Sequence, residues 1–155
     1  MKRLVIIPTI LFLLIGCSDK QISKFELIEC YKVALQSIYN VDGDSFNKDL
    51  KYIVIKLDNL DIETDDKIKL INYMTDLSGV EVVEGDYSRI ESNMINYNKF
   101  GGMAITLDKQ KIISLNNIEL VSRKFYLSGL EMKQTLEKKN GEWTISQISG
   151  IKKSK

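Results

Sequence analysis

The stretch LEMKQTLEKKNGEWTISQI at residues 130–148 predicts a β-hairpin. Its centre is Asn140-Gly141, the strongest short hairpin sequence, because both central residues of that tight turn need a positive φ. Before the turn, apolar and polar residues alternate, which is typical of a strand with one buried and one solvated face. The apolar set is Leu130, Met132 and Leu136, and the polar set is Glu131, Lys133, Thr135 and Glu137. After the turn, Trp143 and Ile145 continue the buried face, so both strands are expected to cover one core.

Two further strands are predicted upstream of the hairpin, over Gly102–Ile113 and Ile118–Leu127. Short turn segments separate the predicted strands, and strands joined in this way pair antiparallel. These segments are Leu115-Asn116-Asn117 and Ser128-Gly129. Gly101-Gly102 lacks the context of a phosphate-binding loop, and we interpret it as a bend at a strand start. The chain is therefore expected to end in an antiparallel meander, with its last strand stopping at Ile148.

The clearest helix is predicted over Ser23–Tyr39. Ser23 and Glu26 form a capping box, in which each side chain satisfies a free backbone N–H of the other residue. Apolar residues recur at three- and four-residue spacing and predict one buried stripe. They are Leu27, Tyr31, Ala34, Leu35 and Ile38. Cys30 lies at the same spacing, and we interpret it as a core residue rather than a reactive thiol.

Between this helix and the meander, the sequence predicts a mixture of strands and helices. Lys51–Leu57 is almost continuously apolar, which is typical of a strand covered on both faces. A helix is predicted from Thr64 to a C-cap at Gly79, with two acidic residues in its first turn. Its inner face is expected to hold Ile68, Ile71 and Met74. The following segments are expected to be a strand at Val80–Val83, a short helix at Asp86–Ser92 and a polar loop at Asn93–Lys99.

These elements predict the fold class α+β. The N-terminal helices are expected to pack on one face of a curved, mainly antiparallel sheet that ends in the C-terminal meander. A chain of 155 residues is the size of one domain. The predicted domain covers residues 23–149 and is followed by a basic tail at 150–155.

Composition excludes several classes of function. The chain has no His, which removes Ser-His and Cys-His catalytic groups and the usual zinc ligand sets. Its formal net charge of +1 argues against a nucleic-acid partner, which would need a basic excess. Two Cys are too few for a disulfide scaffold.

The first residues, MKRLVIIPTILFLLIGCSDK, have the form of a targeting segment. Lys2 and Arg3 precede a thirteen-residue apolar run, Leu4–Gly16, which is shorter than the ~20 residues of a membrane-spanning helix. Leu14-Ile15-Gly16-Cys17 resembles the bacterial lipoprotein box. The resemblance implies a diacylglyceryl group on Cys17, cleavage between Gly16 and Cys17, and a protein on the extracytoplasmic face of the cell membrane. Residues 1–16 would then be the signal peptide, and residues 17–22 the lipidated Cys with a short tether.

The domain itself resembles a group of small lipoproteins of low-GC bacteria. The resemblance rests on KYIVIKLDNL at 51–60, VEVVEGDYSRIE at 80–91, GGMAITLDK at 101–109 and KKNGEWTI at 138–145. The hairpin with its Trp is also similar to the ends of cystatin-like and nuclear-transport-factor-like folds. These are strand and turn patterns, and folds of this kind host many functions, so the resemblance implies no activity.

No motif in the chain predicts catalysis or a metal. Residues 40–45, NVDGDS, imitate the start of a calcium loop, but Ser45 stands where Gly is required and Lys51 where an acidic ligand is required. Ser149 and Lys152 have the spacing of a Ser-Lys pair, but they follow the last predicted strand without a companion motif. The sequence therefore predicts a protein that is not an enzyme, with no cofactor and no metal.

The predicted function is a membrane-anchored, non-catalytic protein-binding domain, an adaptor or an inhibitor. Its expected partners are the membrane, through the lipid anchor, and a protein of the cell envelope. The alternative is a carrier of a small molecule or peptide, with a pocket between the sheet and the first helix. Residues 40–66 carry a net −5 and residues 123–155 a net +5. The fold either intermixes these charges or forms two charged faces, with the basic one against anionic lipid.

Overall fold

Two helices and one six-stranded sheet make up the part of the chain that the structure describes, residues 22–43, 49–85, 101–126 and 129–154 of a computed structural model. The elements in chain order are α1 (Lys24–Asn40), β1 (Tyr52–Lys56), α3 (Thr64–Ser78), β2 (Glu81–Glu84), β3 (Gly102–Ser114), β4 (Asn117–Phe125), β5 (Gly129–Lys139) and β6 (Glu142–Ser154). The α+β class predicted from the sequence is confirmed.

The strand order in the sheet is β2-β1-β3-β4-β5-β6. β3 to β6 form the predicted antiparallel meander. β1 pairs parallel with both β2 and β3, with Ile53 opposite Val82 on one side and Met103 on the other. Short β1 therefore lies inside the sheet, which explains its continuous run of buried residues.

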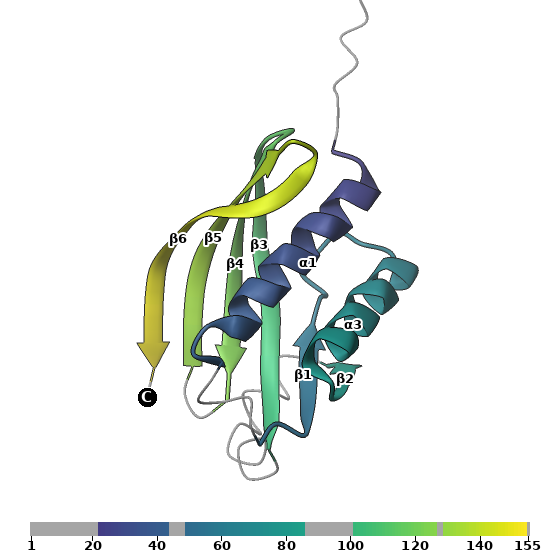
Figure 1. Cartoon of the computed structure of the whole chain (residues 1–155), viewed down its shortest axis with the longest axis vertical. Helices are drawn as coiled ribbons and strands as arrows, with labels where there is room; N and C mark the ends of the chain where they lie inside the picture. Colours follow the sequence, from purple (N-terminus) through teal and green to yellow (C-terminus); the bar gives the residue numbers. More distant parts are fainter. Residues whose placement is uncertain (1–21, 44–48, 86–100, 127–128, 155) are drawn as a thin grey trace, which may run out of the picture.

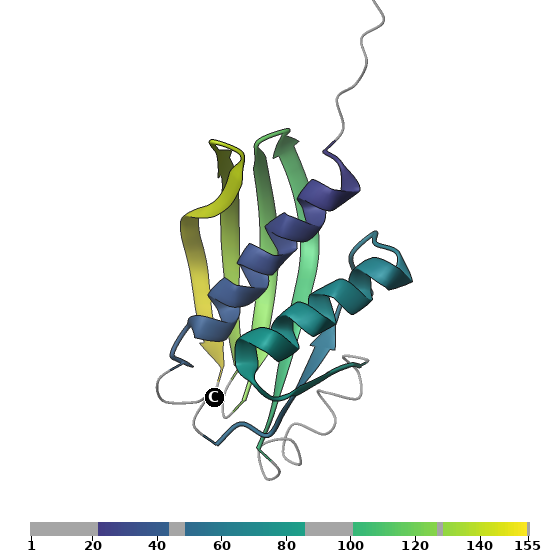
Figure 2. The same ribbon diagram turned by 45° about the vertical axis from the view of Figure 1, so that its right-hand side comes forward.

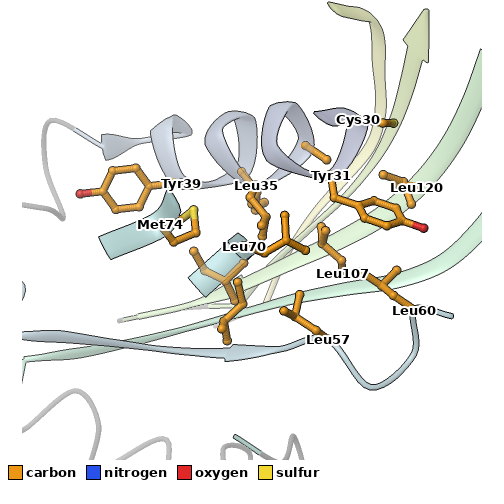
Figure 3. Packing of buried hydrophobic residues seen from close by; sticks show 14 of the residues in the cluster. Cys30, Tyr31, Leu35, Tyr39, Leu57, Leu60, Leu70, Met74, Leu107 and Leu120 are labelled. Atoms are coloured by element: carbon orange, nitrogen blue, oxygen red, sulfur yellow. The ribbon is translucent and has the colours of Figure 1, made fainter. Parts of the chain in front are cut away.

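Both helices cover the same face of the sheet (Figures 1 and 2). α1 contacts β3, β4, β5 and β6, while α3 lies beside α1 and contacts β2. The main core fills the layer between helices and strands, where Leu35, Leu70 and Leu107 are fully buried (Figure 3). Cys30 is also fully buried, as predicted, and this burial raises the pKa of its thiol to about 12.

The ends of both helices are those that the sequence predicts. Ser23 is the N-cap of α1 and forms the capping box with Glu26, and Gly79 ends α3 with a φ of 70°. The predicted inner face of α3 is partly wrong, because Ile68 is 49% exposed. The face that packs inward carries Asp66, Leu70 and Met74, at four-residue spacing, since α1 and the sheet meet α3 from that side.

The predicted Asn140-Gly141 turn is confirmed, with φ values of 54° and 90°. The predicted end of the last strand at Ile148 is wrong, because β6 continues to Ser154 and residues 150–154 are not a separate tail. Gly150 has a φ of 63°, and the pairing register with β5 shifts between Glu131 and Lys133. A bulge at this point bends the strand without ending it. The Ser149-x-x-Lys152 spacing therefore lies within a paired strand.

Several predictions concern residues outside the described ranges. These are the signal peptide with Gly16, Cys17 and residues 18–21 of the tether, the short helix at 86–92 and the loop at 93–99. Ile22, the last residue of the predicted tether, packs in the core instead.

The bend at Gly101 provides a test of this fold. Gly101 has a φ of 74°, and a Cβ there would lie 2.9 Å from the backbone oxygen of Asp49. Gly79 has a similar φ of 70°, but a Cβ there would have no neighbour within 4 Å. We expect Gly79→Ala to lower the free energy of unfolding by about 1 kcal/mol, the cost of the left-handed backbone alone. Gly101→Ala should cost about 2–3 kcal/mol, because the clash adds to that strain. Urea denaturation measures both, and equal costs would contradict the close approach at Gly101.

Candidate functional site

The first turn of α1 is fixed against the β5–β6 hairpin by a charged contact. The Ser23 N–H donates to Glu26 Oε2 at 3.0 Å, and the Glu26 N–H donates to Ser23 Oγ at 3.3 Å. The same Glu26 carboxylate forms an ion pair with Lys138 on β5. The hydrogen bond from Lys138, followed by that from the Ser23 backbone, lowers the pKa of Glu26 to about 2. The contact therefore persists at any physiological pH.

A surface pocket of about 380 Å³ lies beside this contact. Its lining residues are Ser23, Phe25, Glu26, Glu29, Lys138, Gly141 and Trp143. Trp143 is 7% exposed, and within the described residues its indole Nε1 makes no hydrogen bond. The pocket thus combines an aromatic wall with a charged rim, at the edge of the interface between α1 and the sheet.

The same end of the molecule carries exposed apolar side chains. α1 begins at the end where the β3–β4 and β5–β6 turns lie, and we call this region the hairpin end (Figures 1 and 2). Its exposed apolar residues are Phe25 (74%), Ile112 (51%), Ile113 (49%) and Leu115 (41%). The sequence predicts a strand that contains Ile112 and Ile113, and it gives no prediction of their exposure. Ile112 and Ile113 are adjacent in a strand and close to a polar turn. Because neighbouring strand residues point to opposite faces of the sheet, this position indicates that one of the two lies outside the core.

The interface between α1 and the middle of the sheet is closed. Met132 and Leu136 are fully buried beneath the helix. Gln134 Nε2 donates to the backbone oxygen of Ala34 at 3.1 Å, and Ser122 Oγ donates to Gln134 Oε1 at 3.1 Å. The pocket of about 380 Å³ therefore lies at the first turn of α1, beside this closed part of the interface.

Lys124 on β4 is buried under the other end of α1, only 4% exposed. Its Nζ donates to the backbone oxygen of Tyr39 at 3.2 Å and to that of Val41. These carbonyls end the helix, where positive charge is favoured. Burial nevertheless lowers the pKa of Lys124 to about 8. Because its hydrogen bonds are made to helix carbonyls, we assign this amine a structural role.

A row of charged residues crosses the sheet on β3, β4, β5 and β6. Arg123 pairs with Asp108 and, from Nε, with Glu131 Oε2 at 2.7 Å. Lys152 lies 3.7 Å from Glu131. Hydrogen bonding from Arg123 lowers the pKa of Glu131, so this carboxylate is not suited to accept or release a proton near neutral pH. The row is a set of cross-strand ion pairs that stabilises the sheet.

The two charged segments of the sequence come together in the fold. Asp42, from the acidic segment, pairs with Lys153 from the basic segment at 2.8 Å. Lys152 and Lys153 also lie at the end of the sheet opposite the hairpin end (Figure 1). The expected basic face near the tether is therefore not supported. Residues 40–43 of the calcium-like loop are described, and across the described ranges no group of three metal-ligating side chains is present.

Neither helix of the described part is long and apolar enough to span a membrane. Comparisons of the chain with protein-family models, with curated proteins and with solved structures find no match. The resemblances to lipoproteins and to cystatin-like folds stay predictions, and the function has to be inferred from the residues themselves.

The buried Lys124 predicts a specific pH dependence of stability. In the unfolded chain the amine has its ordinary pKa of 10.5, whereas the folded protein releases the proton near pH 8. The unfolded state binds more protons between these values, so this group makes the protein more stable as the pH rises. We expect the free energy of unfolding of the wild type, relative to that of Lys124→Met, to increase between about pH 7 and about pH 10. Cys30 and Tyr31 are present in both proteins, so their titration cancels, and a difference that stays constant would contradict this.

Proposed function

We propose that the chain is an extracytoplasmic lipoprotein, held to the cell membrane by an acylated Cys17. Its folded domain is a non-catalytic protein-binding domain that acts as an adaptor or an inhibitor. The observation that carries the proposal is the distance along the chain between Leu14-Ile15-Gly16-Cys17 and the start of the fold. Only residues 18–21 separate Cys17 from Ile22, which packs in the core directly before the Ser23 cap.

A diacylglyceryl group on Cys17 supplies two acyl chains, which is enough for stable anchoring, whereas a single chain binds only marginally. Four linking residues extend about 17 Å between Cys17 and Ile22, so the domain would stay next to the lipid surface. Partners within reach are then restricted to proteins of the same membrane or its immediate surroundings.

The outer edge of β6 is the surface that favours a protein partner. β6 is the last strand of the sheet and spans Glu142–Ser154. Ile148 and Ile151 are 40% and 54% exposed along it. A sheet edge offers backbone hydrogen-bonding groups to an added strand, and apolar side chains along it supply contact area. The ion pairs of Lys152 and Lys153 with Glu131 and Asp42 leave little net charge to repel such a partner.

The pocket at the first turn of α1 favours the alternative, a carrier of a small molecule or peptide. Its volume of about 380 Å³ is in the range of small-molecule sites. The side chain of Trp143 lines the pocket and offers an apolar wall to a ligand. Co-purified ligands, identified by mass spectrometry of protein extracted from membranes, would favour this alternative.

The lipid anchor is tested by replacing each of the two Cys in turn. Cys17→Ala should abolish acylation, so that uncleaved precursor accumulates. Cys30→Ala is the matched control, because Cys30 is buried in the core and should leave processing unchanged. Metabolic labelling with a fatty acid and the mass of the N-terminal peptide measure both. Normal processing and acylation of Cys17→Ala would refute the anchor.

The protein-binding role is tested with a photo-crosslinking residue placed at Ile151 on β6. The control position is Ile68 on α3, which has a similar exposure of 49%. We expect one envelope protein to be crosslinked in cells from position 151 and not from position 68, and to be lost in the Cys17→Ala background. Equal crosslinking from both positions, or none from either, would argue against a partner at the β6 edge.

A further inference from the structure

The exposed apolar residues of the hairpin end stand apart from the rest of the surface. Within the described ranges, Phe25 lies in the first turn of α1, and Ile112, Ile113 and Leu115 lie at the β3–β4 turn, while the other large exposed apolar residues lie elsewhere. These others are Ile68 on α3, Val83 on β2, and Ile148 and Ile151 on β6. Four exposed apolar side chains at one end mark an interaction surface. This surface is separate from the β6 edge with Ile148 and Ile151, where the proposed protein partner binds.

The hairpin end is also a rigid unit, because the start of α1, the β3–β4 hairpin and the β5–β6 hairpin are joined by hydrogen bonds and an ion pair. The Lys138 N–H on β5 donates to the Asn116 oxygen of the β3–β4 turn at 2.9 Å. The Lys138 side chain pairs with Glu26 of α1, and Tyr31 of α1 is hydrogen-bonded to Gln110 of β3. The exposed apolar side chains are therefore presented by a pre-organised platform, which loses little conformational freedom on binding.

We propose that the hairpin end docks onto the lipid bilayer and sets the orientation of the domain on the membrane. This inference rests on the proposed acylation of Cys17. The chain enters α1 at the hairpin end, and a tether of about 17 Å is shorter than α1, which is about 25 Å long. The end nearest to the acyl chains is thus the end that carries the exposed apolar side chains.

Apolar contact, and not charge, drives this docking. Three of the lysines at the hairpin end are paired with a carboxylate: Lys24 with Glu63, Lys138 with Glu26, and Lys139 with Glu137. Lys111, beside Ile112, adds one exposed positive charge. Side chains of Ile, Leu and Phe gain free energy on entering the boundary between headgroups and acyl chains. Docking should therefore be insensitive to salt and should need no anionic lipid, unlike docking through a basic surface.

The test uses the whole lipidated protein, reconstituted into phosphatidylcholine vesicles. An environment-sensitive fluorophore is attached to Ile113→Cys, with Ile68→Cys and Ile151→Cys as controls. Ile68 matches Ile113 in residue type and in its exposure of 49%. The native Cys30 is buried and its pKa is raised, so it should not react with the label. Lipids with a spin label in the upper acyl chain serve as quenchers.

We expect the label at position 113 to shift its emission to the blue and to be quenched several-fold more than the labels at 68 and 151. Raising the salt or adding anionic lipid should leave this difference unchanged. The variant Phe25→Ser/Leu115→Ser, with its anchor intact, should reduce the quenching at 113 several-fold. Thermal unfolding of each labelled protein verifies that it is folded.

Three results would overturn the proposal. Equal quenching at 68, 113 and 151 would mean that the domain has no fixed orientation. Salt-sensitive quenching at 151 alone would mean that the end with Lys152 and Lys153 faces the bilayer. A blue shift at 113 in native membranes without quenching by lipid would mean that a protein covers this end. The mass of the Cys17 peptide is measured separately, so the absence of the anchor is distinguished from the absence of docking.

Discussion

The attachment of α1 to the sheet is the constraint on which the rest of the structure depends. Lys138 pairs with Glu26 at the start of the helix, Gln134 binds the Ala34 carbonyl in the middle, and Lys124 binds the last carbonyls. These three polar contacts fix how the helix lies across the strands, and the apolar core fills the space between them. The helix start, and with it the entry of the chain, is thereby fixed beside the β3–β4 and β5–β6 turns.

The sequence predicted those parts of the fold that are determined locally. The capping box at Ser23, the C-cap at Gly79 and the turn at Asn140-Gly141 each need particular residues at fixed spacing. Features set by distant contacts were missed. The apolar run of β1 indicated a strand covered on both faces but not its parallel partners, and the rotation of α3 that exposes Ile68 depends on its packing against α1. β6 passes Gly150 because β5 continues to offer it a partner, which composition near Gly150 does not indicate.

The same distinction applies to the candidate site. Acylation of Cys17 is a prediction from a short motif, because the proposed modification is directed by neighbouring residues. The exposed apolar surface of the hairpin end was not predicted, since the exposure of Ile112 or Phe25 depends on which distant segments pack against it. Lys124 shows the reverse case. It was counted in the basic segment, yet it lies under α1 with its amine bound to helix carbonyls. Net charge along a segment therefore overestimated the charge that the folded surface presents.

The size of the apolar surface at the hairpin end is consistent with a tethered domain. Four partly exposed side chains would bind a free domain to lipid only weakly, since each gains only part of its full transfer free energy. A tether of a few residues makes this contact intramolecular and raises the effective concentration of the domain at the bilayer. A small apolar surface is then sufficient to orient the domain, while a larger one would favour aggregation before the protein reaches the membrane. With the hairpin end on the lipid, the C-terminal half of β6 points away from the bilayer, where a protein partner has access.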